Sequence, residues 1–376
     1  MAGLTEEDLQ HVFEHARTCW RELAGARIFV TGATGFVGKW LLESLLFASD
    51  RLNLSVRITA LTRDPARFRV GFPHLALHSA VELLAGDAAT FPFPHEEYPF
   101  VVHAATEPSW PASSAAPTSN FDANVAGTRR VLEFARQRGA RRFLLTSSGA
   151  VYGRQPSEMT HIPEEYRGAP DPHDPATAYG QAKRVSEFLS AMYARQFGFD
   201  VLIARLFAFS GPYLPLDQNF AVGNFVRDAA SGGPIQVKGD GTAYRSYLYA
   251  ADLAVWLWTI LTRGESGRPY NVGSADAVTI GELARSVAKA AGTGVEVVTA
   301  HSYTPGKPAE RYVPCVERSA RELGLTPRID LLEGLRRMYA AAPGNPRAAE
   351  GSRRECPQPA AGPADAWIGM DKTGNF

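Results

Sequence analysis

Short apolar runs alternate along the chain with longer stretches in which apolar residues recur every three or four positions. Runs of the first kind are typical of buried strands, and stretches of the second kind are typical of helices. The expected strands are ARIFVTG at 26–32 and the segments 55–63, 81–87, 100–106, 141–149 and 200–207. The expected helices are 36–48, 122–139 and 177–197. This alternation predicts an α/β fold with a Rossmann-like, doubly wound parallel sheet.

The pattern loosens after residue 208, where glycine and proline become frequent and the predicted elements become short. Helical periodicity returns at 279–292 and 330–340. We therefore predict a dinucleotide-binding Rossmann domain over 26–208, with contributions from about 243–273, and a smaller C-terminal substrate-binding lobe over 209–341. Residues 342–376 are rich in Pro, Ala, Gly and Arg with little periodicity, which predicts a disordered tail.

The N-terminal residues 1–25 form a further segment with a helical pattern. Thr5 precedes an acidic turn, as a helix cap does. Apolar residues follow at helical spacing, at Leu9, Val12, Phe13, Cys19, Trp20 and Leu23. We expect an N-terminal helical extension that packs on the main body.

Composition excludes several classes of function. The chain of 376 residues carries 39 Lys plus Arg and 39 Asp plus Glu, so it lacks the basic excess of nucleic-acid binders. Its three cysteines form no CxxC motif or Cys/His cluster, which argues against a disulfide framework or a metal site. No apolar run reaches the ~18 residues of a membrane span, and the polar, acidic N-terminus lacks the plan of a signal peptide. We expect a cytoplasmic protein without a nucleic-acid or membrane partner.

The first chemical motif is VTGATGFVG, which places Gly32, Gly35 and Gly38 between the first strand and the first helix. Glycines at this junction let the backbone approach a pyrophosphate, which then binds to the free N–H groups of the helix N-terminus. The motif predicts a dinucleotide site. Its expected contact residues are Gly32, Thr34, Gly35, Phe36, Val37 and Gly38.

The end of the second strand bears on the choice between NAD and NADP. An acidic residue there binds the ribose 2′-hydroxyl of NAD, but the sequence is Leu61-Thr62-Arg63-Asp64. Arg63 suits the 2′-phosphate of NADP or stacking on the adenine, and Asp64 is close enough in sequence to reach the ribose. NAD is the first expectation, and NADP stays open because of Arg63.

Tyr179 and Lys183 of YGQAK stand one helical turn apart, and Ser148 lies in TSSGAVYG at the end of an expected strand. Together they form a proton-transfer set. A tyrosine of pKa ~10 needs about 4 kcal/mol of differential stabilisation to become a base at neutral pH. Lys183 and a positive nicotinamide ring can supply it, while Ser148 holds the substrate oxygen.

With these motifs in place, the chain from about 26 to 340 resembles the extended short-chain dehydrogenases/reductases, in their nucleotide-sugar epimerase/dehydratase group. The resemblance implies a nucleotide-linked sugar as substrate and a homodimer that pairs the helices at 122–139 and 177–197. It also implies roles for further residues: Asp87 at the adenine, Ala104, Ala105 and Asn124 along the cofactor, and Arg245 at the phosphates of the nucleotide. Glu107, Trp110, Asn219 and Phe220 lie in loops expected to face the cleft, and Glu107 and Asn219 join Ser148 and Arg245 as candidate substrate-binding residues.

Two departures from this group concern the substrate. Its dehydratases carry an Asp-Glu pair directly after the Ser/Thr, and this chain has Gly149 and Ala150. Losing a general acid and a general base costs about 5–11 kcal/mol, so dehydration requires a replacement from Glu107, His173 or Asp174. Ala208 and Ser210 also stand where the group has Asn and Tyr, which removes a polar contact to the sugar.

The leading hypothesis is an epimerase-type enzyme that transiently oxidises a hexose, expected at C4, with Tyr179 as acid and base. Three alternatives stay open. They are an NADPH-dependent keto-sugar reductase, a nucleotide-sugar 4,6-dehydratase with relocated acid and base, and a non-catalytic NAD(P)-binding protein. The last alternative is expected to lose Tyr179 or Lys183, and both are present.

Overall fold

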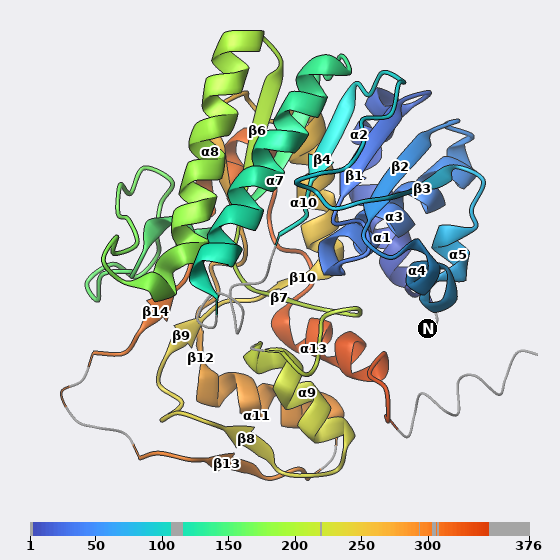
Figure 1. Ribbon diagram of the computed structural model, residues 1–376. Coiled ribbons are helices and arrows are strands. Elements are labelled where there is room, and N and C mark those ends of the chain that lie inside the picture. The colour runs from blue at the N-terminus through green and yellow to red at the C-terminus, as the bar shows by residue number, and fades with distance from the viewer. Residues whose placement is uncertain are drawn as a thin grey trace, which may run out of the picture.

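The computed structural model describes residues 3–106, 116–218, 220–292, 294–302, 306 and 308–345. The described part of the chain builds a seven-stranded sheet in the order β11-β6-β5-β4-β1-β2-β3, and every adjacent pair is parallel (Figure 1). Its strands are β1 (Arg27–Thr31), β2 (Arg57–Thr62), β3 (Val81–Ala85), β4 (Phe100–His103), β5 (Arg142–Ser148), β6 (Asp200–Leu206) and β11 (Pro269–Val272). The predicted α/β fold with a Rossmann-like parallel sheet is therefore confirmed.

Strand order reverses at β1, which pairs with β2 on one side and with β4 on the other. The connections after β1 and β4 leave toward opposite halves of the sheet, so a crevice opens between them at the carboxyl ends of the strands. The glycine loop follows β1 at this point. The topology alone thus predicts where a ligand binds.

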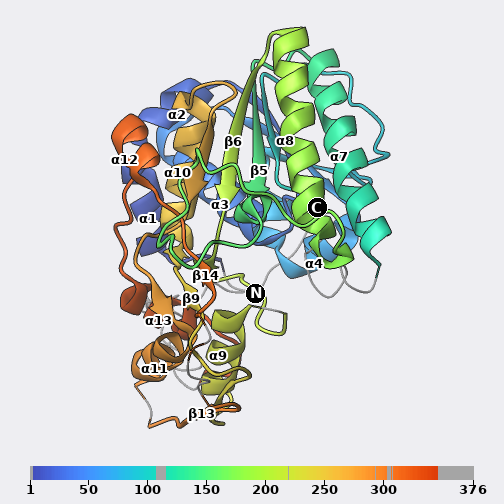
Figure 2. The same cartoon turned by 90° about the vertical axis from the view of Figure 1, so that its left-hand side faces the viewer.

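Helices cover both faces of the sheet, as the edge-on view shows (Figure 2). Alternate residues of β1 face opposite layers: Ile28 and Val30 pack with the cluster on one face, and Phe29 packs with the cluster on the other. The first layer contains α3 (Phe36–Leu52), α10 (Ala250–Arg263) and the N-terminal helices. The second contains α7 (Pro117–Gln137) and α8 (Ala178–Phe197).

Helix α10 has no separate counterpart in the sequence prediction. Its sequence AADLAVWLWTILTR is apolar on all sides, and Trp256 and Trp258 are each 1% exposed. Residues 250–262 are all buried, because the helix is enclosed between the sheet and the N-terminal helices. The short elements α4 (Pro65–Gly71), α5 (Pro73–Ala76), α9 (Ala221–Ala230), α12 (Glu317–Leu323), η1 (Gly149–Tyr152) and η2 (Pro175–Thr177) also lack a counterpart in the prediction.

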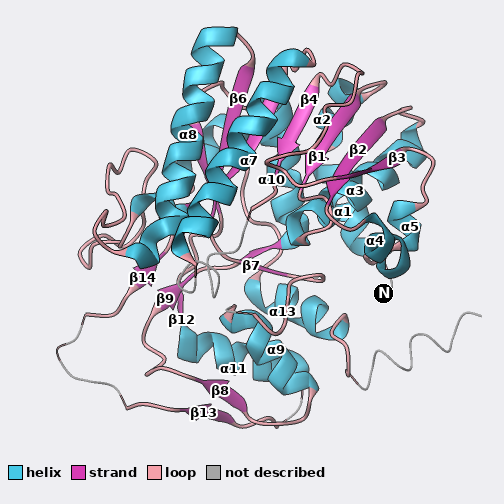
Figure 3. Cartoon of the chain, in the orientation of Figure 1, coloured by secondary structure: helices cyan, strands magenta, loops and turns pink. Residues whose placement is uncertain are grey.

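Below the carboxyl ends of the sheet lies a second, smaller core (Figures 1 and 3). Helices α9, α11 (Ile280–Ala291) and α13 (Leu331–Ala340) enclose Val226, Leu283 and Leu335, which are fully buried. Both predicted C-terminal helices are present. Three small sheets complete this part: β8 (Ile235–Val237) with β13 (Val297–Thr299), β7 (Phe209–Ser210) with β10 (Leu248–Tyr249), and β9 (Tyr244–Arg245) with β12 (Val278–Thr279) and β14 (Arg311–Tyr312).

No helix in the described part of the chain is long and apolar enough to cross a membrane. The predicted tail begins at residue 342. Residues 342–345 are described, with Ala342 and Asn345 buried, and residues 346–376 lie outside the described part of the chain.

The N-terminal segment forms two helices, α1 (Glu6–His15) and α2 (Arg17–Leu23), where a single continuous stripe was expected. The chain leaves the helical conformation at Ala16, between them. Thr5 caps α1 as predicted, because its side chain accepts a hydrogen bond from the N–H of Asp8 at 3.2 Å.

Asp8 is fully buried and connects α1 to the rest of the molecule. Its two carboxylate oxygens accept hydrogen bonds from Tyr249 Oη and Arg337 Nη1, each at 2.8 Å. On the next turn, His11 Nε2 lies 2.8 Å from Asp252 Oδ1. The extension is therefore joined by polar contacts to α10 and α13 as well as by apolar packing.

We predict that Asp8→Ala lowers the free energy of unfolding by about 3 kcal/mol, because Arg337 and Tyr249 then lose a buried partner. Urea unfolding followed by circular dichroism measures this loss. Glu6→Ala is the matched control, since Glu6 pairs with Arg51 on the surface, where such pairs contribute about 1 kcal/mol or less. Equal effects of the two substitutions would contradict the role of Asp8.

Candidate functional site

A cavity of about 1020 Å³ lies at the carboxyl end of the sheet. Residues directly after successive strands line it: Gly32 after β1, Arg63 after β2, Asp87 after β3, Ala104 after β4, and Ser148 at the end of β5. The cavity continues into the smaller lobe, where Arg245 and Tyr247 also line it. It is therefore one continuous space that reaches from the glycine loop to the second core.

The glycine loop allows a backbone approach that no side chain could tolerate. Gly32 has φ +69°, and a Cβ there would lie 2.5 Å from the backbone of Ala104. A Cβ at Gly38 would lie 2.2 Å from the carbonyl oxygen of Gly32. Gly38 is not among the cavity-lining residues and serves the close packing of α3 on the loop, whereas Thr34, Gly35, Phe36 and Val37 do line the cavity.

Helix α3 begins at this loop, with Gly35 as its N-cap and no capping side chain among the described residues. The first N–H groups of the helix therefore point toward the cavity without a side-chain acceptor. This arrangement suits a pyrophosphate, since both the hydrogen-bond donors and the helix dipole favour an anion. The loop fits a dinucleotide cofactor on its own geometry.

Asp64, which the sequence left open as a ribose contact, is not among the described residues that line the cavity. Its Oδ1 accepts the N–H of Arg67 at 2.9 Å and so caps α4, which begins at Pro65. Arg63 lines the cavity instead. Among the described lining residues, Asp87 is the one carboxylate, and its Oδ1 also accepts the N–H of Ala89.

The segment after β4 is held by a buried histidine. His103 lies between Thr31 Oγ1 at 2.8 Å and Thr128 Oγ1 at 3.2 Å. Burial lowers its pKa to about 3, so the ring is neutral and connects β1 with α7. This contact holds Ala104 and Ala105 in place, and Asn124 lines the same side of the cavity. Asn124 Oδ1 accepts a hydrogen bond from Thr106 Oγ1 at 2.7 Å.

Ser148, Tyr179 and Lys183 face the same cavity. Lys183 is 3% exposed, and its Nζ donates to the carbonyl of Thr146 at 2.9 Å. Burial lowers the pKa of Lys183 to about 8, and the charge of Glu187 opposes that shift. Burial raises the pKa of Tyr179, while hydrogen bonds from Ser148 and Thr106 act against the rise. The sequence prediction did not include Thr106, which no motif singles out.

The first of the two positions where dehydratases carry acidic residues, Gly149, is closed to such a side chain, whereas Ala150 lines the cavity. A Cβ at Gly149 would lie 2.6 Å from Tyr312 Oη and 2.7 Å from Cζ of Phe207. His173 and Asp174, considered as replacements, are not among the described lining residues, and Asp174 caps η2 through the N–H of Ala176. Glu107, the third candidate, lies outside the described residues, as do Trp110 and Asn219.

The lining in the smaller lobe combines one cation with aromatic and apolar groups. Arg245 donates from Nη1 to the carbonyl of Tyr244, and its Nη2 lies 3.9 Å from Glu310. Phe220, Tyr247 and Tyr312 also line this end. Ala208 is a lining residue without a polar group, so the contact expected from the family pattern is absent at that position.

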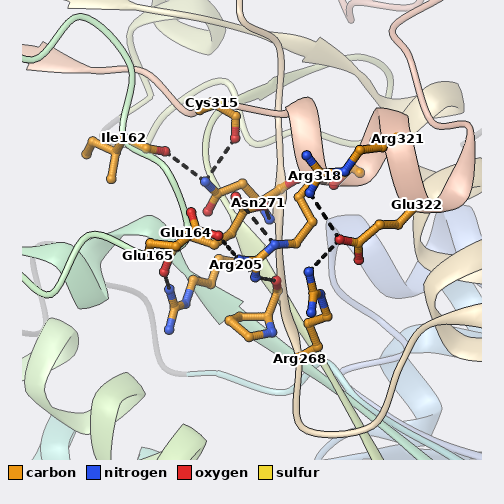
Figure 4. Close-up of polar contacts among 12 residues, drawn as sticks. Ile162, Glu164, Glu165, Arg205, Arg268, Asn271, Cys315, Arg318, Arg321 and Glu322 are labelled. Carbon is orange, nitrogen blue, oxygen red and sulfur yellow. Dashed lines mark hydrogen bonds and ion pairs between the residues drawn. The ribbon is translucent and has the colours of Figure 1, made fainter.

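Behind the site, a buried polar cluster holds the segments that surround it (Figure 4). Asn271 on β11 donates from Nδ2 to the carbonyls of Ile162 and Cys315, and its N–H donates to Glu164. Arg205 on β6 forms an ion pair with Glu187 at 2.7 Å. The sequence prediction missed this cluster, because its members come from five separate segments.

Comparisons with known proteins agree with this geometry. UDP-glucuronic acid decarboxylase 5 of Arabidopsis thaliana is 31% identical over 314 residues, covering 82% of this chain and 87% of that protein. A dTDP-glucose 4,6-dehydratase from Streptomyces venezuelae with NAD bound is 25% identical with a TM-score of 0.71, covering 84% and 96% of the two chains. A UDP-glucose 4-epimerase from Thermus thermophilus in complex with NAD is also 25% identical, with a TM-score of 0.68, covering 84% and 98%.

A sequence profile of the NAD dependent epimerase/dehydratase family matches residues 28–273, which include the glycine loop, Ser148, Tyr179, Lys183 and Arg245. The cofactor of this family is NAD, which the geometry of the glycine loop fits. The chain is an enzyme that belongs to the NAD-dependent epimerase/dehydratase family.

Proposed function

We propose that this enzyme transiently oxidises the hexose of a nucleotide-linked sugar, at C4, and then reduces it again in a changed form. The observation that carries the proposal is one cavity that joins the glycine loop to Ser148, Tyr179 and Lys183 and then continues to Arg245. This order of lining residues suits a dinucleotide at the glycine loop, a reacting sugar carbon at Tyr179 and a nucleotide diphosphate at Arg245. Relatives named for UDP-glucuronic acid, UDP-glucose and dTDP-glucose support a nucleotide sugar as substrate.

The chemistry of the first step belongs to Tyr179. Its oxygen takes the proton of the sugar hydroxyl, Ser148 donates a hydrogen bond to the same sugar oxygen, and the buried ammonium of Lys183 stabilises the phenolate. The ammonium lies 5.7 Å from the centre of the Tyr179 ring. A bound nicotinamide supplies the acceptor and later the donor of the hydride.

The residues beside Ser148 limit the reactions open to the oxidised sugar. Elimination of water needs a general acid and a base, and Gly149 and Ala150 supply neither. The filled space above Gly149 leaves no room for a side chain there. We therefore propose that the hydride returns to a keto sugar that has either turned over in the site or lost and regained the proton on the neighbouring carbon. This outcome is epimerisation, and we favour it over 4,6-dehydration.

Decarboxylation is a second candidate, which the similarity to UDP-glucuronic acid decarboxylases favours. Oxidation at C4 of a sugar with a carboxylate on C5 produces a β-keto acid. The bond from C5 to the carboxylate then breaks, carbon dioxide leaves, and the electron pair passes to the ketone oxygen that Ser148 and Tyr179 hold. The resulting enolate takes up a proton from water at C5, and the hydride then returns to C4. This step needs no residue at positions 149 and 150, so the same site is suited to it.

Net reduction of a keto sugar with NADPH is the third candidate. Arg63 lines the cavity after β2, and the carboxylate of Asp64 is committed to the cap of α4. A guanidinium at the end of the second strand suits a ribose 2′-phosphate. Such a reductase differs from the first two candidates in stoichiometry, since it consumes one cofactor per product.

The remaining contacts are proposed from the lining of the cavity. Asp87 suits the adenine, Ala104, Ala105 and Asn124 suit the length of the cofactor, and Arg245 suits the phosphates of the nucleotide sugar. Residues 26–208 with 243–273 then act as the cofactor domain, and 209–341 act as the substrate lobe. We also propose a cytoplasmic location, consistent with the free thiols of Cys19 and Cys315.

A homodimer through α7 and α8 is proposed from their outer surface. Val131, Leu132 and Phe134 are fully buried within the subunit and are not available to a partner. On α8, however, Phe188 is 66% exposed and Met192 is 41% exposed. The two helices lie side by side with an uncovered outer face (Figures 1 and 2), which a second copy could cover.

We predict that wild-type enzyme converts at least one nucleotide-linked hexose without added cofactor, and that Tyr179→Phe lowers this rate by about 10²–10⁴-fold. The substitution removes only the proton-carrying oxygen. A panel of UDP- and dTDP-linked glucose, galactose and glucuronic acid, read by mass spectrometry and NMR, measures it. Tyr193→Phe on the same helix is the matched control, since Tyr193 is not among the described lining residues.

The product distinguishes the candidates. An isomer of unchanged mass indicates epimerisation, and loss of carbon dioxide from the glucuronic acid substrate indicates decarboxylation. Loss of water would mean that an acid and a base outside positions 149 and 150 serve elimination. Turnover of a keto sugar only with added NADPH would transfer the assignment to a reductase.

We also predict that Phe188→Asp converts a dimer to a monomer, because a charge at the centre of an apolar interface stays unpaired and desolvated. Light scattering at micromolar concentration measures the mass. Leu77→Asp, at a position that is 70% exposed on another face, should leave the mass unchanged. A wild-type protein that is already monomeric would rule out this interface.

A further inference from the structure

Ser148 is flanked by two tyrosines rather than one. The hydroxyls of Tyr179 on α8 and Tyr312 on β14 both lie close enough to Ser148 for its side chain to act against the burial that raises their pKa values. All three residues line the same cavity. The Tyr312 hydroxyl occupies the space directly above Gly149, where a Cβ would lie 2.6 Å from it. Position 149 thus lacks a side chain of its own, and a hydroxyl from the smaller lobe fills that space.

The strand that carries Tyr312 is held from several sides. Tyr312 pairs with Arg245 in the parallel register of β14 and β9, and its ring packs on Phe207 with centroids 4.7 Å apart. The N–H of Val313 donates to Gln155 Oε1 at 2.9 Å. The carbonyl of Cys315 accepts Asn271 Nδ2 within the polar cluster of Figure 4. The hydroxyl therefore has a fixed position relative to β5.

The hydrogen-bond capacity of Ser148 makes this contact directional. A serine hydroxyl has one hydrogen to donate and two lone pairs to accept with. Ser148 Oγ already accepts the N–H of Ala150 at 3.1 Å. A bond donated by Tyr312 would fill the second lone pair and direct the single hydrogen of Ser148 to the remaining side, toward Tyr179 and the substrate oxygen.

The two tyrosines differ in their surroundings in a way that suits different tasks. Burial raises the pKa of Tyr179 as well, but this residue has the Lys183 ammonium 5.7 Å from its ring centre. Burial raises the pKa of Tyr312 well above its ordinary value, so this phenol keeps its proton throughout the physiological range. A hydroxyl that stays protonated is a constant donor.

We propose that Tyr312 is a positioning residue for the reaction: its hydroxyl, delivered from the smaller lobe, donates to Ser148 and fixes the direction in which Ser148 donates to the reacting oxygen. This inference rests on the proposed function, because it concerns the sugar oxygen that Ser148 holds. The proposal also explains how Ser148 can be held in a defined orientation although position 149 is a glycine without a side chain. The contact links the smaller lobe directly to the catalytic set.

A double-mutant cycle tests the proposal with the nucleotide sugar that wild-type enzyme converts most rapidly. We expect Tyr312→Phe to lower kcat about 10-fold, the effect of one hydrogen bond, and to change KM by less than about 3-fold. In a Ser148→Ala background, the same substitution should change kcat by less than about 2-fold, because its target is gone. Tyr244→Phe, on the neighbouring strand and not among the described lining residues, is the matched control and should leave both constants unchanged.

The possible failures are separable. A loss of about 10-fold from Tyr312→Phe in both backgrounds would show that Tyr312 acts independently of Ser148 and would overturn the proposal. An unchanged kcat in the single variant would overturn it as well. Absence of wild-type turnover with every sugar of the panel would instead contradict the proposed function, and with it the role of Ser148 on which this inference depends.

Discussion

The arrangement of the site depends on one close backbone contact, between the loop after β1 and the segment after β4. Gly32 lies so near Ala104 and Ala105 that any side chain at position 32 would overlap their backbone. The contact occurs where strand order reverses, and His103 holds it from behind as a neutral hydrogen-bonding group. It joins the loop from which α3 begins to the segment beside β5, the strand that ends at Ser148. The cofactor loop and the strand that carries Ser148 are therefore connected through this contact.

A second constraint comes from the smaller lobe, which completes the site that the sheet begins. The sheet presents Ser148, and α8 presents Tyr179 and Lys183, but the space above Gly149 belongs to Phe207 and Tyr312. In the dehydratases that this chain resembles, acidic side chains follow the Ser/Thr directly. Here two aromatic rings and one hydroxyl occupy that space. This exchange explains why the cavity contains Ser148, Tyr179 and Lys183 but, among its described residues, no acid and base beside Ser148 for elimination.

Local patterns were sufficient to predict the sheet, and they singled out Ser148, Tyr179 and Lys183, which the structure brings to one cavity. A parallel sheet is buried on both faces, so its strands appear as apolar runs, and the Tyr179/Lys183 pair was recognised from its helical spacing together with the segment around Ser148. Helix α10 was not predicted as a separate element, because it lies in a region where frequent glycine and proline indicated only short elements. Asp64, left open as a ribose contact, caps α4, and Pro65 after it was the sequence signal for that cap. Tyr312 could not be found, since its partner Ser148 is far away in sequence and no motif connects them.

The central claim is that Tyr179 and its partners carry out a transient oxidation, with the hydride returned to the carbon from which it came. A nucleotide sugar labelled with deuterium at C4, converted in ordinary water by enzyme without added cofactor, tests this most directly. The account predicts that NMR finds the label retained at C4 of the product. This result holds for epimerisation and for decarboxylation alike, because both return the same hydride. Loss of the label to water, or its recovery on released nicotinamide nucleotide, would contradict the claim.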